Sequence, residues 1–122
     1  MDKNQPVDFF IEDGILIGVL KIQQSLDIDS LKKIVKERLK VCKGKSYPTL
    51  YEFNILEHIN KDAREYMNRV SSEGILATAL VSKNKESNII INAIIAINNQ
   101  DVPVKVFTDK TKAIKWLKQF IK

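Results

Sequence analysis

The sequence contains few of the residues on which metal sites, disulfide frameworks and phosphate-binding loops depend. Among its 122 residues there is one cysteine, Cys42, and one histidine, His58, which excludes an internal disulfide and a multi-histidine metal site. The four glycines are isolated from one another, so the G-x-G-x-x-G and P-loop patterns are absent. The nucleophile motif G-x-S-x-G is absent as well. We therefore expect no metal, no cofactor and no enzymatic activity.

Long apolar runs are also missing. The longest, residues 89–97, is interrupted by Asn92 and is much shorter than the ~20 residues that a membrane-spanning helix needs. The N-terminal MDKNQPVDFF is polar with mixed charge, unlike an export signal. Hydrophobic residues nevertheless make up 44% of the chain, enough for one core. We expect a single cytoplasmic domain over residues 1–122 with no transmembrane segment.

Alternating strand-like and helix-like segments predict an α/β domain. Asp13-Gly14 separates two apolar runs, residues 9–12 and 15–22, which is typical of a β-hairpin. Strands that alternate with helices then imply parallel pairing and right-handed crossovers. The predicted order is strand–strand–helix–strand–helix–strand–helix–strand–helix. It forms a five-stranded, mostly parallel sheet with an antiparallel N-terminal edge strand.

Capping residues and apolar spacing predict where the later elements lie. We expect four helices: one over residues 30–43, one from a cap at Asn60 to a stop at Gly74, one over residues 86–99, and one that follows a cap at Thr108 or Asp109. We expect the later strands over residues 48–54, 75–81 and 104–107.

The net charge of +5 is concentrated in two predicted helices. Residues 105–122 hold six lysines against Asp109, and residues 30–45 hold a second basic cluster that includes Arg38. Base recognition relies on arginine, asparagine and glutamine, whereas these faces carry mainly lysine without interleaved aromatic residues. We interpret them as solvated helix exteriors and find no strong nucleic-acid signal. Of the last helix, we expect Lys112, Lys115, Lys118 and Lys122 to be exposed and Ile114, Leu117 and Ile121 to point inward.

The predicted helix over residues 86–99 is apolar around most of its circumference, which exceeds the single stripe of a surface helix. Positions 90, 93, 94 and 97 share one face and form the expected core stripe. Ile91 and Ile95 lie on an adjoining flank. Because extra apolar surface marks interaction sites, we predict that these two residues contact a second copy of the chain, another protein or an apolar ligand.

The lone cysteine and the lone histidine have simple structural interpretations. Cys42 falls on the apolar face of the first predicted helix, so we expect it to be buried and structural. His58 precedes a predicted helix, and we interpret it as a loop residue. An enzyme that uses His58 as a general base beside Glu57 or Asp62 is the least supported hypothesis, because no further group assists it.

Two segments carry a resemblance to a known family. Residues 47–67, YPTLYEFNILEHINKDAREYM, and residues 102–120, VPVKVFTDKTKAIKWLKQF, resemble STAS-like domains, the group that includes bacterial anti-sigma-factor antagonists. The chain is most similar to the small bacterial STAS/SEC14-type proteins of unassigned function. The resemblance implies sequentially ordered strands wound as a βα superhelix.

The resemblance also implies a functional edge at the loop and start of the second helix. Antagonist members carry a phosphorylated serine there, in a D-S-S-G-like sequence. The matching stretch here is Asn60, Lys61, Asp62, Ala63 and Arg64, which holds no serine, threonine or glycine. We therefore expect a partner-facing loop without a phosphoserine switch.

Our leading hypothesis is a non-enzymatic protein-interaction or regulatory module that acts as a homodimer or binds another protein. The alternative hypothesis is a carrier or binder of a lipid or other small apolar ligand, with the third predicted helix as one wall of its pocket. Fold-level analogy supports that alternative, and such analogy says little about function.

Overall fold

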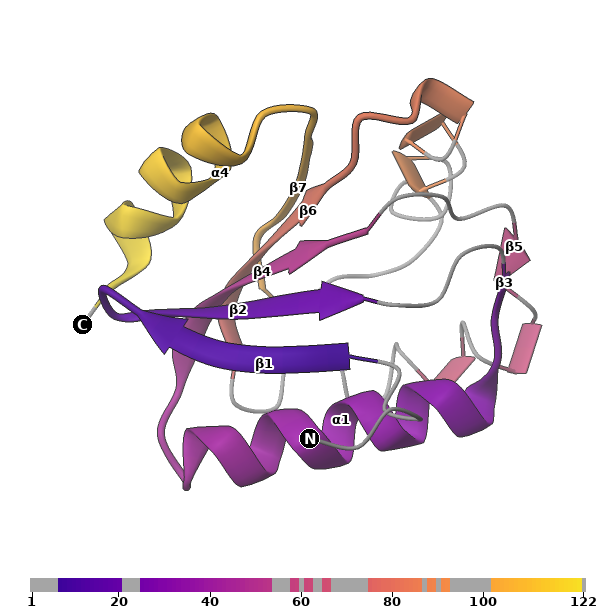
Figure 1. Ribbon diagram of the computed structural model, residues 1–122, viewed down its shortest axis with the longest axis horizontal. Coiled ribbons are helices and arrows are strands. Elements are labelled where there is room, and N and C mark those ends of the chain that lie inside the picture. Colours follow the sequence, from indigo (N-terminus) through magenta and orange to yellow (C-terminus); the bar gives the residue numbers. More distant parts are fainter. Residues whose placement is uncertain are drawn as a thin grey trace.

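The computed structural model describes residues 7–20, 25–53, 58–59, 61–62, 65–66, 75–86, 88–89, 91–92 and 102–121. Its main element is a five-stranded sheet with the strand order β1-β2-β4-β6-β7 (Figure 1). The strands span Val7–Glu12 (β1), Ile15–Leu20 (β2), Tyr47–Glu52 (β4), Ile75–Val81 (β6) and Val104–Phe107 (β7). β1 is antiparallel to β2, and the other neighbours are parallel. The predicted α/β fold class is thus confirmed.

Asp13 and Gly14 connect β1 to β2, as the sequence predicted. Their φ angles are 53° and 82°, and positive φ at both central residues is what a type I′ turn requires. Glu12 pairs directly with Ile15, so the loop is two residues long. A loop of this length sets the register of the hairpin and therefore decides which side chains of β1 face each side of the sheet.

Helix α1 (Ile28–Cys42) begins slightly before the predicted Ser30. Asp27 is its N-cap, and the Asp27 carboxylate accepts a hydrogen bond from the Ser30 backbone N–H at 2.8 Å, which lowers the pKa of Asp27. The helix ends where Lys43 and Gly44 both adopt left-handed backbone, with φ of 51° and 82°. Gly44 thus ends the predicted helix in the left-handed conformation, and the turn starts one residue earlier, at Lys43.

Helix α4 (Lys110–Leu117) continues into the 3₁₀ turn η1 (Lys118–Phe120). The Asp109 carboxylate accepts from the Thr111 N–H at 2.9 Å, so Asp109 is the cap. The helix exposes Lys112, Lys115 and Lys118 as predicted, and it buries Leu117 and half-buries Ile114. Lys122 lies outside the described residues.

Ile121 was predicted to point inward, and the structure corrects this. Its side chain is 41% exposed. The three residues before it, Lys118–Phe120, form a 3₁₀ turn with three residues per turn, so α-helical spacing no longer determines its direction. It lies instead against the turn at Gly14, within 3.5 Å of where a Cβ would stand.

Helices α1 and α4 lie on opposite faces of the sheet (Figure 1), and strand side chains alternate between two cores. The core on the α1 side contains Leu31 and Ile34 of the helix, together with Val7 and Phe53. The core on the α4 side contains Ala113 and Leu117 of the helix, together with strand residues Ile15, Ile17, Leu50, Ala77, Ala79 and Val81.

A small parallel pair, β3 (Ser25–Leu26) with β5 (His58–Ile59), was not predicted. His58 therefore belongs to a strand and not to a loop. Residues 61–62 and 65–66 are helical, as are residues 85–86, 88–89 and 91–92. These positions agree with the second and third predicted helices, whose remaining residues lie outside the described part of the chain.

Candidate functional site

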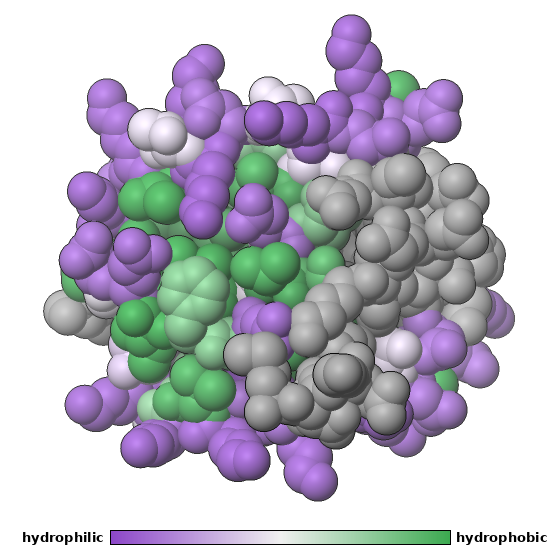
Figure 2. Space-filling view, in the orientation of Figure 1, coloured by the Kyte–Doolittle hydropathy of each residue, from purple (hydrophilic) through white to green (hydrophobic). Residues whose placement is uncertain are grey.

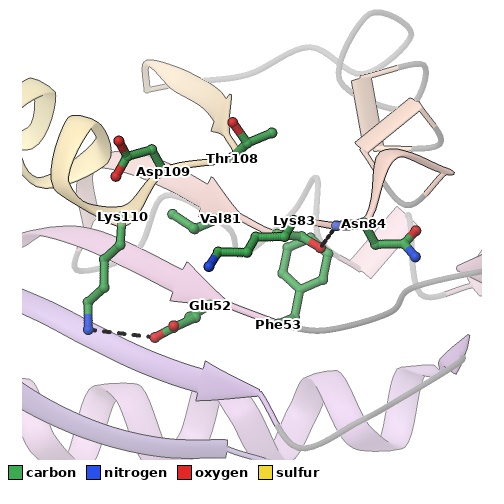
Figure 3. Close-up of a pocket in the computed structure, with 9 residues that line it drawn as sticks. Glu52, Phe53, Val81, Lys83, Asn84, Thr108, Asp109 and Lys110 are labelled. Atoms are coloured by element: carbon green, nitrogen blue, oxygen red, sulfur yellow. Dashed lines mark hydrogen bonds and ion pairs between the residues drawn. The ribbon is translucent and has the colours of Figure 1, made fainter.

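A pocket of about 540 Å³ lies at the carboxyl ends of three parallel strands. Because β4, β6 and β7 run in the same direction, the residues that follow them meet at one edge of the sheet, where open α/β sheets commonly bind ligands. Figure 3 shows their side chains around this pocket. The lining residues are Glu52, Phe53, Val81, Ser82, Lys83, Asn84, Thr108, Asp109 and Lys110.

The segment after β6 is held by its own side chains. The Ser82 hydroxyl accepts from the Asn84 N–H at 3.1 Å, a local turn that serine favours. The Asn88 side-chain amide donates to the Ser82 carbonyl at 2.8 Å, and the Asn88 backbone N–H donates to the Asn84 carbonyl at 3.2 Å. These bonds fix Lys83, whose side chain is exposed at the pocket.

The charges around the pocket balance one another. Glu52 and Lys110 form an ion pair of 3.7 Å, with side chains 39% and 42% exposed, and Figure 3 shows it as a dashed line. The Asp109 carboxylate is engaged in capping α4. Within the pocket lining, Glu52 thus pairs with Lys110 and Ser82 with Asn84, whereas the partner of Asp109, Thr111, lies outside the lining.

The predicted partner-facing loop is only partly described. Lys61 and Asp62 are helical and exposed, and neither of them lines the pocket. Asn60, Ala63 and Arg64 lie outside the described residues. The functional role of this loop stays a prediction.

The structure places Ile91 in the core, which corrects its predicted position on a partner-facing flank. Ile91 is 5% exposed and packs with Leu31, Ile34 and Phe53. The helical phase explains this, because Asn88, three residues earlier, is buried as well, whereas Ile89 is 69% exposed. The other predicted contact, Ile95, lies outside the described residues.

A buried Arg38 was not anticipated from the sequence. Its place in the basic cluster of residues 30–45 favours a solvated side chain, yet it is 3% exposed. One guanidinium nitrogen donates to the Tyr51 hydroxyl at 3.1 Å. The signal was its spacing, since Arg38 lies four residues after Ile34 and four before Cys42 on the buried stripe of α1.

Burial raises the pKa of two groups near Arg38. Desolvation raises the pKa of the Tyr51 hydroxyl and that of the Cys42 thiol, and the positive charge of Arg38 partly opposes both shifts. Cys42 is 2% exposed, so the prediction of a buried cysteine is confirmed. A raised pKa keeps its thiol protonated and weakly nucleophilic.

The sheet face beyond α4 is left partly uncovered. Helix α4 lies over β4, β6 and β7, and Ile15 and Ile17 of β2 are buried in the same core, so β1 extends past the covered area. Val7 and Phe9 pack in the α1 core, and alternation therefore directs Phe10 to the α4 side, where it is 42% exposed. Figure 2 shows hydrophobic side chains gathered between α4 and the β1–β2 pair. We call this surface the open face and define it by Phe10, Val19, Ile114 and Ile121.

Across the described part of the chain, no helix combines the length and apolar character needed to span a lipid bilayer. The same residues contain no cluster of three histidine, cysteine, aspartate or glutamate side chains that could hold a metal ion.

The five-stranded sheet with the order β1-β2-β4-β6-β7 and helices on both faces is a STAS-like α/β fold. The chain belongs to a family described as a domain of unknown function, DUF7793, whose model matches residues 9–121. No curated protein matches the sequence. Among solved structures, it is similar to an uncharacterized protein of the DUF3478 family from Shewanella loihica PV-4, described as having a SpoIIAA-like fold.

This similarity has a TM-score of 0.64 at 12% sequence identity, and it covers 91% of each chain. At such an identity the likeness concerns the fold alone. It confirms the STAS-like fold that the resemblance implied.

Proposed function

We propose that this chain is a non-enzymatic protein-interaction module that binds a partner protein through the open face. The observation that carries the proposal is the exposure of Phe10 and Ile121, 42% and 41%, within an apolar surface on one side of the sheet. Contiguous apolar patches with polar rims are typical of protein contacts, and aromatic residues are enriched at their centres.

The carboxyl-edge pocket supports a role in recognition more than one in catalysis. The Glu52 carboxylate pairs with Lys110, and the Asp109 carboxylate caps the N-terminus of α4. The absence of serine and threonine from residues 60–64 argues against a phosphoserine switch in this module. A lipid or apolar-ligand carrier has less support, because most residues of this pocket are polar or charged. A cytoplasmic location remains a prediction.

Site-specific photocrosslinking tests the open face. A photoreactive phenylalanine analogue at position 10 should form a covalent adduct with a discrete protein in cells. Ile121→Thr should abolish this adduct, because it removes apolar contact from the same face. Position 11 is the matched control: Ile11 lies on the same strand, is 41% exposed, and points to the opposite side of the sheet. Adducts that form equally from position 11, or that survive Ile121→Thr, would contradict the proposal.

A further inference from the structure

We propose that the open face binds a second copy of this chain, related by a two-fold axis that runs parallel to the strands. This inference rests on the proposed function, and it identifies the partner of the same surface. It follows from the distribution of charge along the two long sides of the open face.

The strand side of the open face is acidic. Asp8 and Glu12 alternate with the α1-side residues of β1, so they share the side of Phe10. Asp13 follows in the turn and is exposed, as is Glu12. We call these three residues the acidic rim.

The helix side of the open face is basic. Trp116 packs against Phe107 of β7, so the opposite flank of α4 faces β2. Helical spacing places Ile114 and Lys118 on that flank, four residues apart, and Lys118 is exposed. Lys110 lies on it as well, but Glu52 balances its charge. We call the end of this flank at Lys118 the basic rim.

The direction of the symmetry axis decides which rims meet. Two copies that pack face to face have their two-fold axis in the plane of the interface. An axis across the strands would place the acidic rim of one copy against the acidic rim of the other, and repulsion between like charges disfavours such a complex. An axis parallel to the strands places the acidic rim of each copy against the basic rim of the other. It also brings Phe10 of each copy over the flank of α4 that carries Ile114.

Electrostatic pairing of this kind is testable by charge exchange. Sedimentation velocity of the full chain should show a concentration-dependent dimer that weakens as salt is added. Glu12→Lys and Lys118→Glu should each weaken dimerisation by about tenfold, because each change places like charges opposite each other twice in the dimer. The double variant Glu12→Lys with Lys118→Glu should restore dimerisation to within a few-fold of wild type. Circular dichroism would show that all variants are folded.

Lys115→Glu is the matched control, since it changes the net charge equally at an exposed position on the outer side of α4. It should leave the dimer unchanged. A wild-type chain that stays monomeric, or a double variant as weak as either single variant, would overturn the inference. If the wild type is monomeric while position 10 still crosslinks to a different protein, the homodimer is wrong and the proposed interaction module stands. Loss of both results would refute both.

Discussion

Tyr51→Phe removes the hydroxyl group that accepts a hydrogen bond from the buried guanidinium of Arg38 at 3.1 Å. Arg38 is only 3% exposed, so water has little access to replace the lost acceptor. Hydrogen bonds to charged groups contribute about 1.5–3 kcal/mol, and we expect the free energy of unfolding to fall by this amount. The shape of the site is otherwise preserved, because phenylalanine keeps the aromatic ring.

Urea unfolding followed by circular dichroism and by the fluorescence of Trp116 measures this change. Trp116 is the only tryptophan and lies in the core on the opposite side of the sheet, so agreement of the two signals also tests cooperative unfolding. The control is Arg38→Met, which removes the buried charge together with its desolvation cost. The double variant should be more stable than Tyr51→Phe alone. The reasoning is refuted if Tyr51→Phe is as stable as wild type, or if Arg38→Met does not rescue it.

Three further predictions concern other parts of the fold. Burial raises the pKa values of the Cys42 thiol and the Tyr51 hydroxyl in the folded state, so the stability that these two groups contribute is complete at lower pH. That stability is lost as the pH rises past 9.0 for Cys42 and 10.0 for Tyr51, which are the ordinary pKa values of the two groups. Alkaline thermal melts should show this loss, and Tyr51→Phe should remove the part of it that occurs at the higher pH. Gly18→Ala would place a Cβ 2.6 Å from a ring carbon of Phe9, so calorimetry should show a destabilisation of about 1–3 kcal/mol, and a more stable variant would contradict this reasoning. Asp109→Ala should cost about 1 kcal/mol in urea unfolding by removing the α4 cap, whereas Asp109→Asn, which keeps an acceptor, should cost much less.

Local chemistry predicted most elements of the fold. The turn at Asp13-Gly14, the strand over residues 75–81 and the cap at Asp109 agree with the structure. Each of these features depends on residues close together in the sequence, such as positive φ at a turn or an acceptor before a helix. The pair β3–β5 escaped prediction because strands of two residues are too short to show periodicity.

The functional residues were harder to predict, because exposure depends on what packs against a side chain. Ile91 and Arg38 are both buried, although the apolar circumference of one predicted helix favoured a partner surface at Ile91 and the basic cluster of another favoured a solvated Arg38. Whether each side chain is buried depends on the rotation of its helix about the helix axis relative to the sheet. Adjacent residues of a helix differ by about 100° in this rotation.

The sequence by itself determined the order of the five main strands, the hairpin, the Asp109 cap and the parallel sheet, because periodicity, turn chemistry and crossover handedness are properties of local chain segments. Only the tertiary structure decided the open face. Phe10 and Ile121 are 111 residues apart in the chain, and nothing in either segment indicates that both remain exposed. Phe10 does so because α4 lies over β4, β6 and β7, and one helix is too narrow, at about 10 Å, to cover five strands spaced about 4.8 Å apart. Ile121 does so because it follows the 3₁₀ turn beyond α4.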